Sequence, residues 1–187
     1  MSGGRIDINV GADDGLPDNY RDLLASIKRN LDPASNTVLL VDDERGIRMK
    51  VARDVKAFDP TIVIHEAVNG RDALDKLATI RQKYHREPLF IVLDLNMPVL
   101  DGWEVIKQLK KEYEEAGKTA GIPIIVLSST SGEKSAFLKR TSIHDGKTGY
   151  VPLVSVAKET CMEKDRYDTA GEKGLMAWLG HFIRQAH

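Results

Sequence analysis

The sequence predicts an α/β protein with a doubly wound, five-stranded parallel sheet that carries helices on both faces and follows a helical extension. Short apolar segments alternate along the chain with longer segments whose apolar residues recur every three or four positions. Apolar runs of this kind are typical of strands buried on both faces of a parallel sheet. Right-handed connections bring the carboxyl ends of such strands to one edge, where we expect the functional residues.

Residues 1–36 are predicted to form an N-terminal extension with one amphipathic helix. The helix is expected to begin near Pro17 and to end before Pro33. Its apolar stripe consists of Tyr20, Leu23, Leu24, Ile27 and Leu31. We expect this stripe to pack on its own domain, and contact with a partner protein is the alternative.

The next elements alternate regularly. Four strands are predicted, in chain order, at residues 37–41, 61–68, 89–94 and 122–129. The helix after the first strand has Ile47, Val51, Val55 and Phe58 at helical spacing, and the helix at 70–84 has Ala73, Leu74, Leu77 and Ile80. A third helix is predicted at 103–117 between the third and fourth strands.

A last helix closes the chain. Its apolar residues are Leu175, Met176, Trp178, Leu179, Phe182 and Ile183, which together span a wide arc. Part of this arc must cover the sheet. Trp178 is expected in the core, with a dimer or partner contact as the alternative.

Acidic residues and hydroxyls follow the predicted strands. The first strand is followed by Asp42 and Asp43, the third ends in Asp94, and the fourth ends in Ser128, Ser129 and Thr130. Three carboxylates at one edge would repel one another, so the pattern indicates a bound cation. Oxygen ligands without a nearby histidine or cysteine favour Mg2+ over zinc. Helix capping is the alternative for Asp42 and Asp43, but no helix directly follows Asp94.

A carboxylate beside a divalent cation can act as a nucleophile toward phosphorus and form an acyl phosphate. Asp94 is the candidate nucleophile, and the Ser128 hydroxyl could bond the transferred phosphoryl oxygens. Pro98 and the Asp101-Gly102 pair would shape the turn that brings the backbone carbonyl of Asn96 toward the metal.

Four motifs carry a resemblance to a known family. "VLLVDDE", "AVNGRDAL", "LDLNMPVLDGWEVI" and "IPIIVLSS" occur in this order and at intervals that resemble the receiver domain of two-component response regulators, which has the flavodoxin-like fold of CheY. The resemblance covers residues 37–130 closely. It implies a phosphorelay protein in signal transduction.

The resemblance implies a role for each matching residue. Asp94 would accept the phosphoryl group, while Asp42, Asp43, Asp94 and the Asn96 backbone carbonyl would hold Mg2+. Ser128 would be the switch hydroxyl. Ser129 would leave room for phosphate access, and Asn96 and Thr130 would tune the lifetime of the acyl phosphate.

The pattern departs from the family beyond Ser131. The family has a fifth strand of the type GYxxKP, whose lysine contacts the phosphoryl group. If the strand begins at Gly149, Tyr150 is the aromatic switch and Leu153 stands at the lysine position; if it is "LVSVAK", Lys158 ends it. We favour Lys158, because a lysine at the strand end supplies the expected positive charge. The segment around 144–170 is longer than in the family.

We therefore predict a receiver domain at 37–187 that is not a turnover enzyme and signals by protein contact without its own output domain. A histidine kinase or phosphotransfer protein would donate the phosphoryl group. A downstream protein would bind the face formed by the fourth helix, fifth strand and fifth helix of a receiver, and a homodimer is left open. The alternatives are a phosphorylation-independent scaffold and an aspartate-nucleophile phosphatase. The phosphatase would need an acid at position 96, where this chain has Asn96.

Composition agrees with this class. The formal net charge is −1, and basic residues are spread along the chain, which predicts no binding to nucleic acid. The single cysteine, Cys161, fits a reducing compartment. No segment approaches the length of apolar chain that spans a bilayer, so we expect a cytoplasmic protein without membrane insertion.

Overall fold

The computed structural model describes residues 18–128, 150–157 and 175–186. Its centre is a five-stranded sheet in the order β2-β1-β3-β4-β5, and every neighbouring pair is parallel. The strands are β1 (Thr37–Val41), β2 (Val63–Ala67), β3 (Phe90–Asp94), β4 (Ile124–Ser128) and β5 (Leu153–Ala157). This confirms the predicted doubly wound α/β class.

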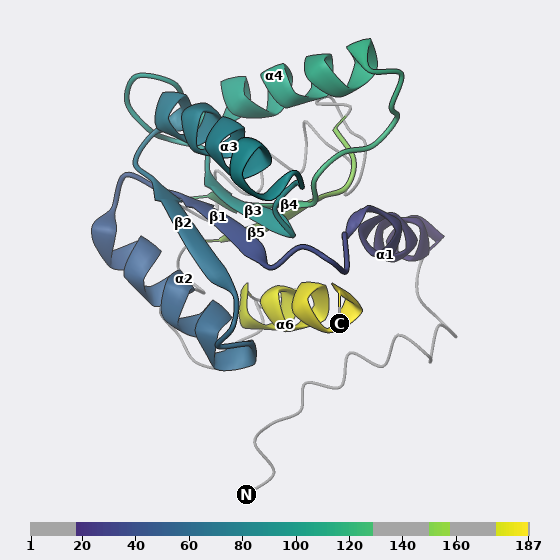
Figure 1. Ribbon diagram of the computed structural model, residues 1–187, viewed down its shortest axis with the longest axis horizontal. Helices are drawn as coiled ribbons and strands as arrows, with labels where there is room; N and C mark the ends of the chain where they lie inside the picture. Colours follow the sequence, from purple (N-terminus) through teal and green to yellow (C-terminus); the bar gives the residue numbers. More distant parts are fainter. Residues whose placement is uncertain (1–17, 129–149, 158–174, 187) are drawn as a thin grey trace, which may run out of the picture.

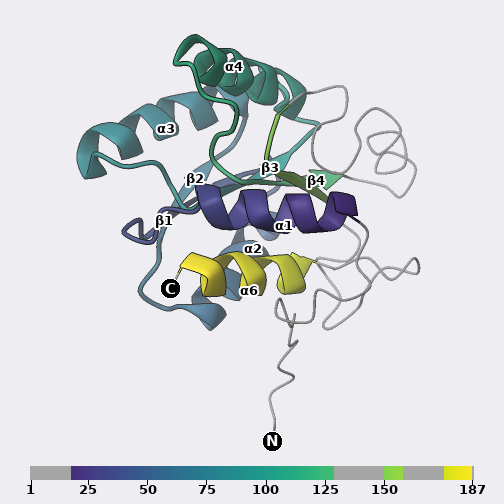
Figure 2. The ribbon, with the colours of Figure 1, turned by 90° about the vertical axis from the view of Figure 1, so that its right-hand side faces the viewer.

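Helices cover both faces of the sheet (Figure 1). The described helices are α1 (Asp18–Asn30), α2 (Arg45–Phe58), α3 (Gly70–Tyr84), α4 (Gly102–Glu115) and α6 (Leu175–Ala186). The pair α3 and α4 lies on one face, and α2 and α6 lie on the other. Figure 2 shows α1 beside α6 on this second face. No helix in the described part of the chain combines the length and the hydropathy needed to span a membrane.

The alternation of side chains along each strand divides the core into two layers. Val38 and Leu40 of β1 belong to the cluster under α1, α2 and α6, whereas Leu39 and Val41 belong to the cluster under α3 and α4. All five residues of β1 are buried, as the apolar run predicted. The edge strand β2 differs, because it has a neighbour on one side only and leaves Val63 41% exposed.

The extension helix α1 is part of the core. Its residues Leu24 and Ile27, and Leu31 just after its end, are buried in the same cluster as the apolar residues of α6. The prediction that the stripe packs on its own domain is therefore confirmed for these three positions. The side chains of Tyr20 and Leu23 lie outside what the structure describes.

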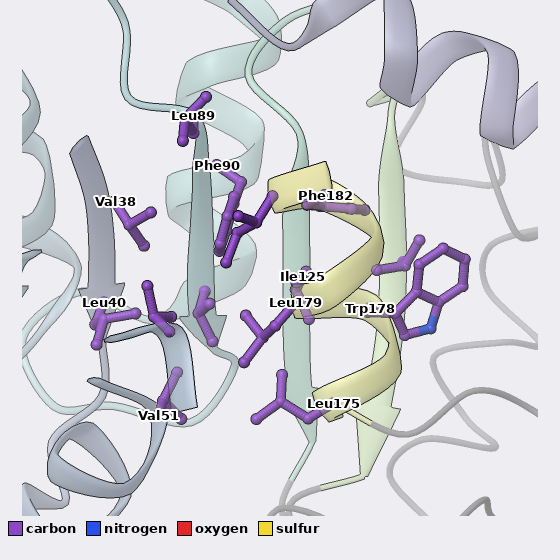
Figure 3. Packing of buried hydrophobic residues seen from close by; sticks show 14 of the residues in the cluster. Val38, Leu40, Val51, Leu89, Phe90, Ile125, Leu175, Trp178, Leu179 and Phe182 are labelled. Carbon is purple, nitrogen blue, oxygen red and sulfur yellow. The ribbon is translucent and has the colours of Figure 1, made fainter. Parts of the chain in front are cut away.

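The apolar residues of α6 pack on the sheet and against α1 and α2 (Figure 3). Phe182 meets Phe90 of β3 edge to face, with ring centroids 5.3 Å apart. Trp178 is only 3% exposed, so its expected core position is confirmed. Phe58 ends α2 with 37% of its surface exposed, and its ring lies against Gly180 of α6.

Candidate metal centre

Three carboxylates from two neighbouring strands converge at the carboxyl edge of the sheet. Asp42 and Asp43 directly follow β1, and Asp94 is the last residue of β3. The two strands pair with Val41 opposite Leu93, which places the next residue of each chain at the same height. One oxygen from each carboxylate can be chosen so that all three lie within 4.8 Å of one another.

Two of these carboxylates are buried. Asp42 is 2% exposed and Asp94 is 1% exposed, whereas Asp43 is exposed. The backbone N–H of Glu44 donates to Oδ1 of Asp42 at 2.8 Å, and that of Asn96 donates to Oδ1 of Asp94 at 3.2 Å. These bonds orient both side chains. A cation among the three carboxylates would offset the repulsion between their charges and the cost of burying Asp42 and Asp94.

Helix capping does not account for the first two acids. The N-cap residue of α2 is Glu44, and it makes no side-chain capping hydrogen bond. Neither Asp42 nor Asp43 stands at the cap position, so the capping alternative is wrong. At α4 the cap is Asp101, whose side chain accepts from the N–H of Glu104.

The turn after Asp94 depends on a close approach at Gly102. The Gly102 N–H donates to the Leu95 carbonyl at 3.0 Å. A Cβ at this position would lie 2.2 Å from the Asp94 carbonyl oxygen and 2.9 Å from the Leu95 Cα. Glycine is therefore required where α4 begins. Val99, in the same turn, adopts a φ of 69° and is 80% exposed.

A second glycine holds this turn against the neighbouring loop. The Gly70 N–H at the start of α3 donates to the Leu100 carbonyl at 2.8 Å, and a Cβ on Gly70 would lie 2.5 Å from that oxygen. Asn69 caps α3 by accepting from the N–H of Asp72. The loop that follows Asp94 is thus fastened at both Gly70 and Gly102. The role of Gly70 has a signal in the sequence, because Asn-Gly is a recognisable turn pair.

The donor set fits a hard divalent cation. The three residues contribute only carboxylate oxygens, which Mg2+ prefers, and no histidine or cysteine belongs to the group among the described residues. Asp42, Asp43 and Asp94 could hold such an ion while leaving other coordination positions for water and substrate oxygens. The Asn96 carbonyl is the further ligand that the resemblance implies.

The remaining predicted residues differ in what the structure describes. Asp94 pairs with Leu127 of β4, so the backbone of Ser128 lies one residue farther along the same edge. The side chain of Ser128 lies outside the described part. Ser129, Thr130 and Lys158 also lie outside it, as does most of the predicted 144–170 segment.

The position of β5 decides between the two alignments of the fifth strand. Leu153 is the first residue of β5 and is 3% exposed, so it lies at the amino end of the strand, away from the carboxylates. Lys158 is the residue after Ala157, the last residue of β5. The described strand is therefore "LVSVA" and does not begin at Gly149, while the role of Lys158 stays a prediction.

Tyr150 precedes β5 and is not brought to the carboxylates. It is 2% exposed, and its hydroxyl donates to the Ile122 carbonyl at 2.7 Å, just before β4 begins. The switch role of Tyr150 depended on a strand that begins at Gly149. Because β5 begins at Leu153, the structure does not favour that role.

Comparisons with known proteins agree with this geometry. The family model described as response regulator receiver domain matches residues 38–151. The protein-glutamate methylesterase/protein-glutamine glutaminase 1 of Carboxydothermus hydrogenoformans is 32% identical over 117 residues, which are 62% of this chain and 30% of that protein. A second protein of this name, numbered 2, from Methanosarcina mazei is 34% identical over 161 residues, which cover 80% of this chain and 40% of that protein.

Solved structures show the same fold. The bacteriophytochrome response regulator AtBRR superposes with a TM-score of 0.57 at 20% identity, over 82% of this chain and 94% of that one. The chain spans less than half the length of the two methylesterases, 30% and 40% respectively. Their similarity therefore concerns a part of each protein.

Proposed function

Because the chain belongs to the response regulator receiver domain family, we propose that it is a signalling module in which Asp94 accepts a phosphoryl group from a histidine kinase or phosphotransfer protein. The observation that carries this proposal is the convergence of Asp42, Asp43 and Asp94 within 4.8 Å at the carboxyl edge. A sheet built only for stability would not collect three like charges there, because each raises the cost of ionising the others.

Asp94 is suited to the role of nucleophile by its position. It ends a strand whose five residues are all buried, so its backbone is held rigidly. The Asn96 N–H holds one carboxylate oxygen, which limits rotation of the side chain. In the proposed transfer, an oxygen of Asp94 bonds to phosphorus while the P–N bond of the donor phosphohistidine breaks. Positioning and charge stabilisation supply most of the rate in such a step.

Magnesium is the proposed cofactor. Receiver domains bind Mg2+ at an acidic pocket, and this chain has the corresponding cluster. We propose that Asp42, Asp43, Asp94 and the Asn96 carbonyl hold the ion. When bound, Mg2+ neutralises charge on the transferred phosphoryl group.

The hydroxyl and lysine positions complete the proposed site. Ser128 would bond the phosphoryl oxygens as the switch hydroxyl, and Lys158 would supply the opposing positive charge. Ser129 would leave space for the phosphate, and Thr130 with Asn96 would set the lifetime of the acyl phosphate. The placement of the Ser128 backbone one residue beyond the register partner of Asp94 supports its part in this proposal.

The proposed output is contact with another protein rather than turnover of a substrate. Residues 37–187 would form the signalling domain and residues 1–36 its extension, in a cytoplasmic protein. We propose that the downstream partner binds the face formed by the fourth helix, fifth strand and fifth helix of a receiver, of which the structure describes β5 and α6. The methylesterase relatives are longer than this chain, and their similarity to it covers 30% and 40% of their lengths.

Phosphorylation with a small donor tests the proposal. The full chain is incubated with Mg2+ and acetyl phosphate, and intact mass and peptide mapping locate the added phosphoryl group. We expect one phosphoryl group on Asp94 and none in Asp94→Asn. Asp101→Asn is the matched control: it removes a carboxylate from the same loop, yet asparagine caps helices as well as aspartate does.

The other outcomes identify the alternatives. An unmodified protein, with no response to beryllofluoride, would indicate a phosphorylation-independent scaffold. Steady hydrolysis of phosphate esters that Asp94→Asn abolishes would indicate the phosphatase. Phosphate on any other residue would overturn the assignment of Asp94.

A further inference from the structure

A second polar cluster lies at the opposite edge of the sheet, where the strands begin. Arg81 of α3 donates to Glu87 through two of its nitrogens, and one of these bonds joins Nη2 to Oε2 at 3.0 Å. The same guanidinium reaches Glu112 of α4 at 2.7 Å. The Tyr113 hydroxyl donates to Oε2 of Glu87 at 2.6 Å. Both carboxylate oxygens of Glu87 are therefore engaged, and Arg81 shares its positive charge between Glu87 and Glu112.

The Tyr113 ring forms a fixed wall beside this cluster. Tyr113 is 7% exposed, and its ring lies 6.2 Å from that of Tyr150 between centroids. A Cβ on Gly121 would lie 2.2 Å from the Tyr113 ring, so any larger residue at this position would clash with the ring. Burial, the main cause, together with the charge of Glu87, raises the pKa of Tyr113 above its ordinary value.

A cavity of about 500 Å³ adjoins this wall. Arg29 and Asn30 of α1 line one side of it, and Glu87, Tyr113 and the turn 117–122 line the others. This volume lies in the range of small-molecule sites, which combine an apolar wall with a few polar groups. The cavity is separate from the carboxylates at the other edge, because none of its lining residues belongs to that cluster.

The lining carries an excess of positive charge. Its charged side chains are Arg29, Glu87 and Lys118, two cations against one acid, and Glu87 is in addition paired with Arg81. In the part of the chain that the structure describes, neither Arg29 nor Lys118 takes part in a recorded ion pair. Among the described residues, these two cations therefore have no acidic partner, and the Lys118 ammonium lies over the Tyr113 ring, 5.9 Å from its centroid.

One wall comes from outside the residues that match the family. The family model begins at residue 38, whereas α1 ends at Asn30. The connection after α1 is fastened close to the cavity: Arg86 pairs with Asp32 at 3.3 Å, and the Ser35 hydroxyl donates to the Glu87 carbonyl at 2.8 Å. A ligand in the cavity would therefore contact both the extension and the body of the domain.

We propose that this cavity binds a small anion carrying phosphate or carboxylate groups, with Arg29 and Lys118 as its cationic contacts and the Tyr113 ring as its apolar wall. Arginine offers a planar array of donors to such groups, and lysine adds a point charge. Binding joins α1 to the α4–β4 turn and stabilises the docked extension. This inference does not depend on phosphorylation of Asp94.

Calorimetric titration of the full chain tests the proposal. The probes are inorganic phosphate, pyrophosphate and citrate, in buffer freed of divalent metal, with the Asp94→Asn protein as a second host. We expect at least one probe to bind both hosts equally. Arg29→Gln and Lys118→Gln should each weaken binding by at least about tenfold, because each removes a charge-assisted hydrogen bond. Binding of pyrophosphate but not citrate would identify a phosphate site, and binding of citrate but not pyrophosphate a carboxylate site. Binding of both would identify a site for anionic charge in general.

Matched controls separate a site from general electrostatic attraction. Lys28 neighbours Arg29 on α1, and Lys107 lies on α4; both are exposed and neither lines the cavity. Lys28→Gln and Lys107→Gln should leave binding within about twofold of the parent, since screened surface charges contribute little. Hydrogen exchange of residues 18–36 should slow when the probe is bound.

Three results would overturn the proposal. The first is no binding of any probe at millimolar concentration. The second is equal weakening by Lys28→Gln and Arg29→Gln. The third is loss of binding in Asp94→Asn, which would place the anion at the carboxyl edge. Thermal unfolding of each variant shows that a loss of binding is not a loss of fold.

Discussion

The two edges of the sheet handle charge in opposite ways. At the carboxyl edge, Asp42, Asp43 and Asp94 gather like charges within 4.8 Å. At the amino edge, Arg81 lies between Glu87 and Glu112, so that opposite charges alternate. Like charges held together destabilise a fold unless a cation joins them, whereas paired charges with shared hydrogen bonds hold elements together. The difference indicates that the carboxyl edge is built for a ligand and that the Arg81 cluster fastens α3 to α4.

Gly102→Ala should cause the largest change in stability, because it forces a Cβ into the Asp94 carbonyl oxygen at 2.2 Å. We expect a loss of about 2–3 kcal/mol in the free energy of unfolding and slower phosphorylation of Asp94. The matched variant is Gly46→Ala on α2, where a Cβ meets nothing within 4 Å. It should stabilise the protein by about 0.5–1 kcal/mol. Urea unfolding measures both, and equal effects would contradict the packing at Gly102.

Glu87→Gln should weaken the amino edge without changing the chemistry at the other edge. The substitution keeps the shape but removes the charge that Arg81 and Tyr113 share. We expect a loss of about 1–2 kcal/mol, limited because the Arg81 side chain is 28% exposed and partly screened. Phosphorylation of Asp94 should proceed as in the parent. Glu115→Gln, whose partner Lys111 is 4.0 Å away at the surface, is the control and should change stability by less than about 0.5 kcal/mol.

Asp43→Asn should change the free energy of unfolding in the opposite direction from Glu87→Gln. In metal-free buffer it removes one of three repelling charges, so stability should rise by up to about 1 kcal/mol, a limit set by the exposure of Asp43. Added Mg2+ should raise the melting temperature of the parent protein more than that of the variant, because the ion binds the folded state. Thermal scans with and without Mg2+ check this; a fall in metal-free stability would show that the acids are not repelling one another.

Of the changes considered, a rise in pH above 10 should cause the smallest loss of stability, and this loss arises at the amino edge of the sheet. The pKa of Tyr113 is raised above 10.0 in the folded protein, mainly by burial and then by Glu87. Above about pH 10 the unfolded chain loses this proton while the folded protein keeps it, so stability is present below pH 10 and falls as the pH rises further. The Tyr113→Phe protein should be less stable at pH 8 but should decline less steeply above pH 10. Parallel slopes would remove Tyr113 as the cause.

The fold and the carboxyl edge could be predicted because their signals are local. Each strand is an apolar run, and its last residue is fixed in space by the sheet, so Asp42, Asp43 and Asp94 could be brought together by topology alone. The stripe of α1 was likewise a local pattern, and Leu24, Ile27 and Leu31 are buried as it indicated.

The amino edge could not be predicted because its residues have no common pattern. Arg81 and Tyr113 are 32 residues apart and face each other only after α3 and α4 pack side by side. The exposure of β2 depends on which strand lies at the edge of the sheet. The order of the strands cannot be predicted from any one segment of the sequence. The alignment of the fifth strand was ambiguous for a similar reason: "GYV" and "LVSVAK" are both acceptable strands, and pairing of Ser128 with Ala157 selects the second.

The burial of Trp178 also gives the molecule an internal optical reporter. The chain contains two tryptophans. Trp178 is 3% exposed in the cluster that contains Leu24 and Ile27 of α1, whereas Trp103 is half-buried at the start of α4, two residues after the cap Asp101. Release of the extension would admit water to one indole, and events at the acidic pocket would perturb the other. Fluorescence of the Trp103→Phe and Trp178→Phe proteins can therefore follow the two ends of this domain separately and in real time.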